Sequence, residues 1–215
     1  MPAKNVVRDF SSDSYYHVFN RGVEKRDIFL DDEDYHMFIY YLLIYLSPLE
    51  KVIEKYPKLP FRLYNKNLSQ EVDIISYCLM PNHFHLLLKQ RTRDGVSKLL
   101  KQVTNGYTLY FNKKYNRVGG LMQGRFKAVR IPTDELLMHI SRYIHLNPVV
   151  AGISKDPKDY KWSSYKDYFR GDDTFVKTRE ILGLFESLTE YENFTNDQID
   201  YAIELNKLKN LSLDD

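Results

Sequence analysis

Apolar positions recur along the chain with two different periods, which predict where strands and helices follow one another. Residues 14–21, SYYHVFNR, alternate loosely and are rich in aromatic and β-branched types, as a first strand would be. Two apolar runs at 71–80 and 83–90 flank the turn dipeptide Pro81-Asn82 and predict an antiparallel hairpin. Residues 125–131, RFKAVRI, alternate basic and apolar side chains. Four strands are therefore expected.

Three further segments carry apolar residues at helical spacing, each with a start or a stop signal. The first follows Asp31, which can cap it, and stops at Ser47. The second begins at Gly95. The third starts at the N-cap candidate Thr133 and is expected to end before Pro148, because a proline ring cannot continue the hydrogen-bond ladder.

The resulting order, βα(ββ)αβα, predicts an α+β fold in which helices cover a ferredoxin-like antiparallel four-stranded sheet. Residues 48–71 show no persistent period and are expected to connect elements with a helical turn or two. We assign residues 1–170 to the main domain and 171–215 to an acidic, helical C-terminal extension. The extension could dock on the core, mediate homodimerisation or screen a basic groove.

Composition narrows the class of protein. Of 215 residues 43% are hydrophobic and 14% aromatic, which is typical of a folded globular chain. Cys78 is the only cysteine, which excludes a disulfide framework and a cysteine-based zinc site. The longest apolar segment, residues 38–46, is about half a membrane span. A soluble, cytoplasmic protein is expected.

The formal net charge of +2 conceals an uneven distribution along the chain. Residues 89–130 contain eleven Lys and Arg against one acidic residue, whereas residues 172–215 contain four basic and eleven acidic residues. Such a basic segment is the footprint of a surface that meets phosphates. A merely solvated basic face is the alternative.

His83 and His85 are the first candidates for chemistry. Alternate residues of a strand share a face, so these two imidazoles project together while Phe84 points into the core. They could be half of a metal site or two polar residues on a solvated face. On the third helix, Tyr143 and Asn147 lie four residues apart and share a face. A packed surface tyrosine and a capping asparagine are the alternative interpretation.

If that helical face lay against the hairpin, two nitrogens and one amide oxygen would surround a divalent cation with positions left open, and Tyr143 would stand beside it. Such a site can orient a phosphodiester for attack by a tyrosine oxygen. The product would be a 5′-phosphotyrosine, which can be rejoined to another 3′-hydroxyl without ATP. Among the other histidines, His17 and His36 have no partner at ligand spacing, and His145 points away from Tyr143.

Several ordered motifs resemble one known family. They are YYHVFNRG, CLMPNHFHLLL, YFNKKYNRVGGLMQGRFKAV, SRYIHLNPVVAG and YKWSSYKDY, which together span about residues 14–170. The His-hydrophobic-His triplet alone is a weak signal, but the ordered set is similar to the single-tyrosine HUH transposases. The resemblance is closest to the REP-associated tyrosine transposases (RAYTs) and their insertion-sequence relatives.

The resemblance implies a DNA endonuclease and strand transferase acting on single-stranded, often hairpin-containing DNA. It implies Tyr143 as the nucleophile, with His83 and His85 as ligands of Mg²⁺ or Mn²⁺ and Asn147 as the third ligand. Insertion-sequence transposases more often carry glutamine at that third position, which favours the RAYT-like branch.

The basic segment then has a specific use, because its side chains could follow the phosphates that flank the cleaved bond. The candidates are Arg21, Lys98, Lys101, Lys113, Lys114, Arg117, Arg125, Lys127 and Arg130. Two other functions compete. One is a non-catalytic nucleic-acid-binding module with a ferredoxin-like sheet, and the other is a metal-dependent hydrolase in which water is the nucleophile.

Overall fold

Four antiparallel strands form the central layer of the molecule, seen in a computed structural model that describes residues 10–171 and 175–204. The strands are β1 (Ser14–Arg21), β2 (Val72–Met80), β3 (His83–Gln90) and β4 (Lys127–Ile131). Their order is β2-β3-β1-β4, and every neighbouring pair is antiparallel. The predicted α+β class with a ferredoxin-like sheet is confirmed.

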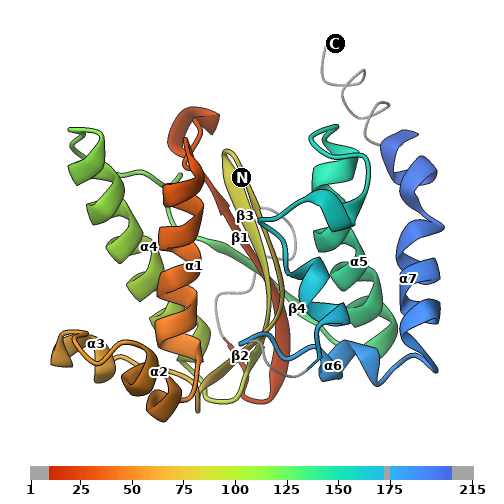
Figure 1. Cartoon of the computed structure of the whole chain (residues 1–215), viewed down its shortest axis with the longest axis horizontal. Coiled ribbons are helices and arrows are strands. Elements are labelled where there is room, and N and C mark those ends of the chain that lie inside the picture. Colours follow the sequence, from red (N-terminus) through yellow and green to blue (C-terminus); the bar gives the residue numbers. More distant parts are fainter. Residues whose placement is uncertain (1–9, 172–174, 205–215) are drawn as a thin grey trace.

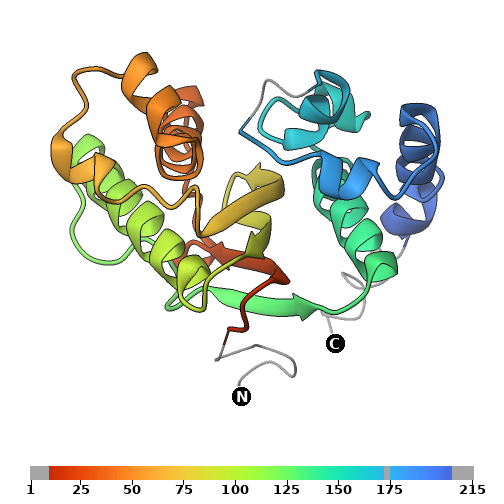
Figure 2. The ribbon, with the colours of Figure 1, turned by 90° about the horizontal axis from the view of Figure 1, so that it is seen from below.

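Helices cover both faces of this sheet, as Figures 1 and 2 show. The helices α1 and α4 pack on one face, while α5 and the C-terminal helices lie on the other. The helices are α1 (Asp32–Leu46), α2 (Leu49–Lys55), α3 (Phe61–Tyr64), α4 (Gly95–Lys114), α5 (Asp134–Val150), α6 (Arg179–Leu182) and α7 (Leu188–Asn196). The described residues also form the short 3₁₀ helices η1 (Val23–Lys25), η2 (Pro157–Asp159) and η3 (Ser164–Phe169).

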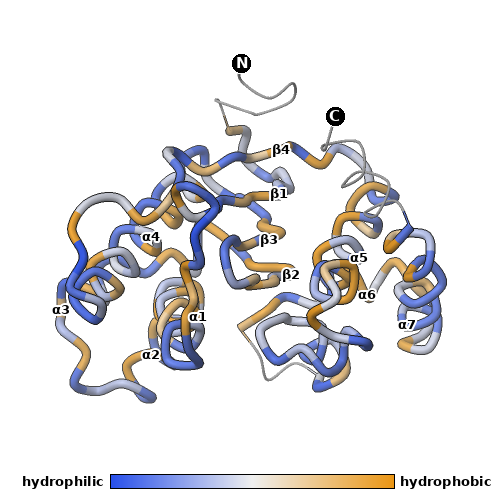
Figure 3. The backbone as a smooth tube through the Cα atoms, turned by 90° about the horizontal axis from the view of Figure 1, so that it is seen from above, coloured by the Kyte–Doolittle hydropathy of each residue, from blue (hydrophilic) through white to orange (hydrophobic). Residues whose placement is uncertain are grey.

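The strand period sorts side chains between the two faces. Phe84 is fully buried and its ring centre lies 5.1 Å from that of Phe38 on α1. His83 and His85, on either side of it, therefore face α5. Figure 3 shows apolar stretches of the strands between the two helical layers, and both faces of β3 are covered, since Leu87 on the His85 face is as fully buried as Leu86 on the other.

Helix α5 begins as the sequence predicts but ends later. The Thr133 hydroxyl accepts a hydrogen bond from Leu136 N at 3.3 Å. The predicted end before Pro148 is wrong, because the helix continues to Val150 with the proline inside its last turn. The proline removes one N–H near the end of the ladder, and the capping bond from Ala151 N to Asn147 O still forms at 3.0 Å.

The C-terminal extension docks on the core, the first of the three roles considered for it. Tyr191 of α7 is fully buried and stacks on Tyr168 with ring centres 4.9 Å apart. Glu180 of α6 accepts hydrogen bonds from the Lys89 ammonium and forms a salt bridge with it at 2.9 Å. Residues 172–174 and 205–215 of the extension lie outside the described residues.

None of the helices in the described ranges is long and apolar enough to cross a membrane.

Candidate active site

The register between β1 and β3 gathers polar side chains on the face toward α5. Arg21 pairs with His83, and Phe19 pairs with His85. Directly paired residues of antiparallel strands share a face, and so do residues two apart along a strand. His17, two residues before Phe19, therefore joins the same surface.

Tyr143 of α5 lies over this surface. Its ring centre is 5.5 Å from that of His85 and 5.8 Å from that of His17, and it meets both rings edge to face. The side chain nevertheless stays half exposed, at 50%. The phenol is thus held beside the histidines while remaining open to a large substrate.

Asn147 lies one helical turn further along α5, close to the other end of the histidine pair. Its Nδ2 donates to Tyr143 O at 3.1 Å, and its side chain lies close enough to His83 to influence the pKa of that imidazole. Burial lowers the pKa of His83, the Asn147 side chain opposes that effect, and the nearby Arg21 charge lowers the pKa further. The structure therefore brings together the two histidines, the tyrosine and the asparagine that the sequence singled out.

His17 belongs to the same cluster, although its sequence position offered no partner at ligand spacing. His17 Nε2 lies 2.9 Å from His85 Nδ1, and both side chains are buried. The pairing of β1 with β3 creates this contact across 68 residues of sequence. Alternation along SYYHVFNR places His17 on one face of its strand, but only the strand order shows which histidine it meets.

The hydrogen bonds leave one nitrogen of each hairpin histidine available for a cation. Asn82 Oδ1 can only accept, so His83 Nδ1, at 2.6 Å from it, carries the proton and His83 Nε2 keeps its lone pair. His85 Nδ1 is engaged by His17, which leaves His85 Nε2. An imidazole whose second nitrogen is held by a neighbouring group is the usual arrangement of a metal ligand.

Burial also keeps these imidazoles neutral, as metal ligands must be. Desolvation lowers the pKa of His85 well below its ordinary value, with smaller effects from His17 and His83, and lowers the pKa of His17 to about 4. Across residues 10–171 and 175–204, no group of three His, Cys, Asp or Glu side chains is placed to hold a metal. Two imidazoles and one amide oxygen fit a divalent cation that keeps several water ligands.

Only some of the predicted DNA-binding residues lie on the face of the sheet that carries His85. Lys127 pairs with Phe19 and shares the face of His85, whereas Arg130 pairs with Tyr16 and faces the opposite side of the sheet. Arg21 lies beside His83, whose pKa its charge lowers. The alternation of β4 therefore divides two of the basic residues between opposite faces.

The remaining basic residues lie around α4 or after it, away from Tyr143. Lys98, Lys101 and Lys113 line a hollow between α1 and α4, and Arg125 lines a smaller one together with Lys101. Lys114 is bound by Asp31, Glu33 and Asp34 at 2.7–3.0 Å, so its charge is neutralised by carboxylates. Arg117 donates to Asn112 Oδ1 at 2.8 Å.

Comparisons with known proteins find similar sequences among transposases. Residues 50–147, which include all four predicted catalytic and metal-binding residues, match the family described as "Transposase IS200 like". This part of the chain is similar to the IS200-like transposases. A Haemophilus influenzae protein named as a REP-associated tyrosine transposase is 27% identical over 172 residues, which cover 75% of this chain and 85% of that protein.

The solved structure of a REP-associated tyrosine transposase bound to a REP hairpin has the same fold as this chain. The two align with a TM-score of 0.55 and 17% identity, over 78% of this chain and 86% of the other. The resemblance to tyrosine transposases is thereby confirmed. The comparisons support a DNA-processing enzyme of the transposase type.

Proposed function

We propose that this protein is a metal-dependent endonuclease and strand transferase of single-stranded DNA, with Tyr143 as its nucleophile. The observation that carries the proposal is the position of Tyr143, which is half exposed while its ring lies 5.5 Å from that of His85. A tyrosine with only a packing role has no need to remain open beside neutral, buried imidazoles.

His83 Nε2, His85 Nε2 and the Asn147 side-chain oxygen would hold Mg²⁺ or Mn²⁺. The cation would supply charge stabilisation at a non-bridging phosphate oxygen and hold the phosphorus in line with the phenol. Arg21 and Lys127, on the same face, would bind the neighbouring phosphates.

In the proposed step, Tyr143 Oη attacks the phosphorus of a phosphodiester and loses its proton. A phosphorus–tyrosine oxygen bond forms, the bond to the preceding 3′-oxygen breaks, and that oxygen takes up a proton as a free 3′-hydroxyl. The 5′-phosphotyrosine retains an ester, so attack by another 3′-hydroxyl reverses the step and joins new ends. No external energy source is needed.

The substrate proposed is DNA with a hairpin next to a single-stranded cleavage position. The solved relative is bound to a REP hairpin, and the curated relative carries the name of the same group. The cations of this chain, spread over both faces of the sheet, suit a folded substrate that extends well beyond the cleaved bond.

The test incubates the full chain with 5′- and 3′-labelled hairpin oligonucleotides and Mg²⁺ or Mn²⁺, and resolves covalent protein–DNA adducts on denaturing gels. Tyr143→Phe should remove the adduct and lower cleavage by more than about 10³-fold, since loss of a nucleophile removes the covalent route. The exposed Tyr201→Phe variant is the matched control and should behave as the wild type.

His83→Ala and His85→Ala should abolish metal-stimulated cleavage in the same assay. Adduct formation by Tyr143→Phe would overturn the nucleophile, and cleavage that persists undiminished in excess EDTA would overturn the role of the two histidines. Metal-stimulated cleavage without any adduct would favour water as the nucleophile.

A further inference from the structure

We propose that the hollow between α1, α3 and α4 is a second DNA-binding site, which holds an unpaired base and its flanking phosphates on the face of the sheet opposite Tyr143. This inference extends the proposed function, since it gives the substrate a second point of attachment. It rests on the shape, charge and hydrogen-bonding groups of the hollow.

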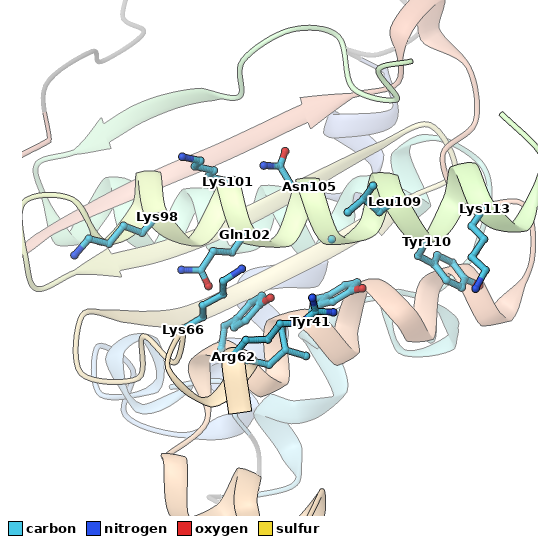
Figure 4. Close-up of a pocket in the computed structure, with 13 residues that line it drawn as sticks. Tyr41, Arg62, Lys66, Lys98, Lys101, Gln102, Asn105, Leu109, Tyr110 and Lys113 are labelled. Carbon is cyan, nitrogen blue, oxygen red and sulfur yellow. The ribbon is translucent and has the colours of Figure 1, made fainter. Parts of the chain in front are cut away.

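The hollow is large enough for more than one nucleotide. It has a volume of about 860 Å³ and is lined by residues of α1, α3 and α4 and by Lys66, which follows α3. In Figure 4, Arg62 and Lys66 extend toward Gln102 and Tyr41, while Lys98, Lys101 and Lys113 follow the length of α4. Two segments far apart in the sequence, residues 62–66 and helix α4, thus contribute cations to one concave surface.

Most of these cations have no acidic partner. Among the described residues, Arg62, Lys66, Lys101 and Lys113 take part in no ion pair, whereas Lys98 pairs with Glu71 at 2.7 Å. Four unpaired positive charges around one hollow repel one another. Bound phosphates would neutralise these charges and remove the repulsion. The hollow therefore suits a ligand that carries several negative charges.

The inner wall offers a flat aromatic side chain and an unsatisfied acceptor. A Cβ atom placed on Gly106 would lie 3.0 Å from the Tyr41 ring, so the glycine allows the phenol to lie against the backbone of α4. A mid-helix glycine costs about 1 kcal/mol relative to alanine. Gln102 Oε1 is buried without a hydrogen-bond donor within the described part of the chain.

A nucleobase suits this wall because it combines a flat face with amino groups that can donate. Packing against Tyr41 would use the face, and rotation of the Gln102 amide, whose oxygen is buried without a donor, would let an exocyclic amino or ring N–H donate to it. An acidic peptide would satisfy the cations, but carboxylates are acceptors and leave the Gln102 oxygen unpaired. The chemistry therefore favours DNA over an acidic protein segment.

A basic route connects this hollow with the catalytic face. Lys101 lines both the large hollow and a smaller one of about 300 Å³, which Asn20 and Arg125 also line. Arg21 follows Asn20 and lies beside His83. A single strand could follow Lys101, Arg125 and Arg21 around the end of β1, from the base-binding hollow to Tyr143.

The first test measures binding of a fluorescent hairpin oligonucleotide with a single-stranded tail by anisotropy, in EDTA, so that neither metal nor cleavage is involved. Arg62→Glu combined with Lys66→Glu should weaken binding about tenfold or more and make the salt slope about 2 shallower. Lys155→Glu combined with Lys166→Glu changes the net charge equally at exposed positions elsewhere and is the control. Equal losses in both double variants would overturn the site.

The second test locates the bound base. Replacement of Leu109, 73% exposed on the rim of the hollow, by photoreactive p-benzoylphenylalanine should crosslink the oligonucleotide, whereas the same replacement of Leu188 on α7 should not. Removal of the base at one position along the oligonucleotide should weaken binding to the wild type. The same abasic oligonucleotide should bind Gln102→Ala no more weakly than the intact oligonucleotide binds that variant. A base-binding site would be refuted if no abasic position weakened binding. It would also be refuted if polyglutamate, but not unlabelled DNA, displaced the labelled oligonucleotide from the protein.

These outcomes separate this inference from the proposed function. Cleavage of a short, unstructured oligonucleotide at saturating concentration should survive Arg62→Glu with Lys66→Glu. Conversely, DNA binding that depends on Arg62 and Lys66 is expected even if Tyr143 is not the nucleophile.

Discussion

His17 is the residue that most changes the chemistry expected of the histidine pair. Its Nε2 occupies His85 Nδ1 at 2.9 Å, so His85 is held by the protein through one ring nitrogen while the other stays free. Groups that hold a metal ligand in this way set its tautomer and its orientation. His17 is therefore a positioning residue for the proposed cation.

Replacement of His17 should weaken metal binding without touching the proposed ligands. We expect His17→Ala to lower Mn²⁺ affinity by about 10- to 100-fold, because His85 loses the neighbour that orients it. Calorimetric or electron paramagnetic resonance titration with Mn²⁺ measures this directly, independently of cleavage.

His17→Gln should restore part of the affinity, since its amide can still accept from His85 Nδ1. The exposed His36→Ala variant controls for loss of a histidine elsewhere. Unchanged Mn²⁺ affinity in His17→Ala would show that this contact has only a packing role.

At the scale of elements, α5 is anchored from two sides by its own chain. His145 is fully buried, with Nδ1 2.7 Å from the Tyr191 hydroxyl of α7 and Nε2 2.9 Å from Ser164 Oγ, which in turn accepts from Tyr77 N of β2 at 2.8 Å. Arg142 donates to Phe194 O at 3.0 Å. The helix that carries the tyrosine is thus fixed to the extension and to the sheet.

We expect Tyr191→Phe to lower the free energy of unfolding by about 1–3 kcal/mol, because it leaves the buried His145 Nδ1 without its partner. Urea denaturation followed by circular dichroism measures the change. Tyr201→Phe, at an exposed position, should change stability by less than about 0.5 kcal/mol. Similar effects of both substitutions would indicate that the extension does not anchor α5.

For the whole molecule, buried histidines predict acid sensitivity. Burial lowers the pKa of His17 to about 4 and that of His145 to about 3, from 6.5. The unfolded chain therefore binds more protons than the folded one below pH 6.5, and stability is complete above that pH and decreases as the pH falls toward the folded-state pKa values.

The slope should reach up to about 1.4 kcal/mol per pH unit for each such histidine below pH 6. Thermal melting between pH 8 and pH 5 measures it, and His17→Gln should melt with a shallower dependence than the wild type. A melting temperature independent of pH over this range would contradict neutral, buried imidazoles.

Much of the fold was predictable from the sequence because its signals are local. Alternation places His83 and His85 together, helical spacing places Tyr143 with Asn147, and Thr133 marks the start of α5. The end of α5 predicted from Pro148 was wrong, since a proline in the last turn lowers helix stability little once the rest of the helix is anchored.

Contacts between distant segments needed the tertiary structure. The charge of Lys114, counted with the basic segment, is neutralised by carboxylates at the start of α1. Arg62 and Lys66, in a stretch without a persistent period, join the lysines of α4 around one hollow. No local pattern indicates which acids or cations will meet, because packing of whole helices decides it.

The sequence alone determined the four strands, the starts of the three long helices, the shared face of His83 and His85, and the motifs that resemble tyrosine transposases, since each of these depends on neighbours within a few residues. Only the tertiary structure decided three contacts: Tyr143 meets His85, His17 holds one ring nitrogen of His85, and α7 anchors α5, the helix that carries Tyr143. Those contacts depend on strand register and layer packing, which are set by burial over the whole chain.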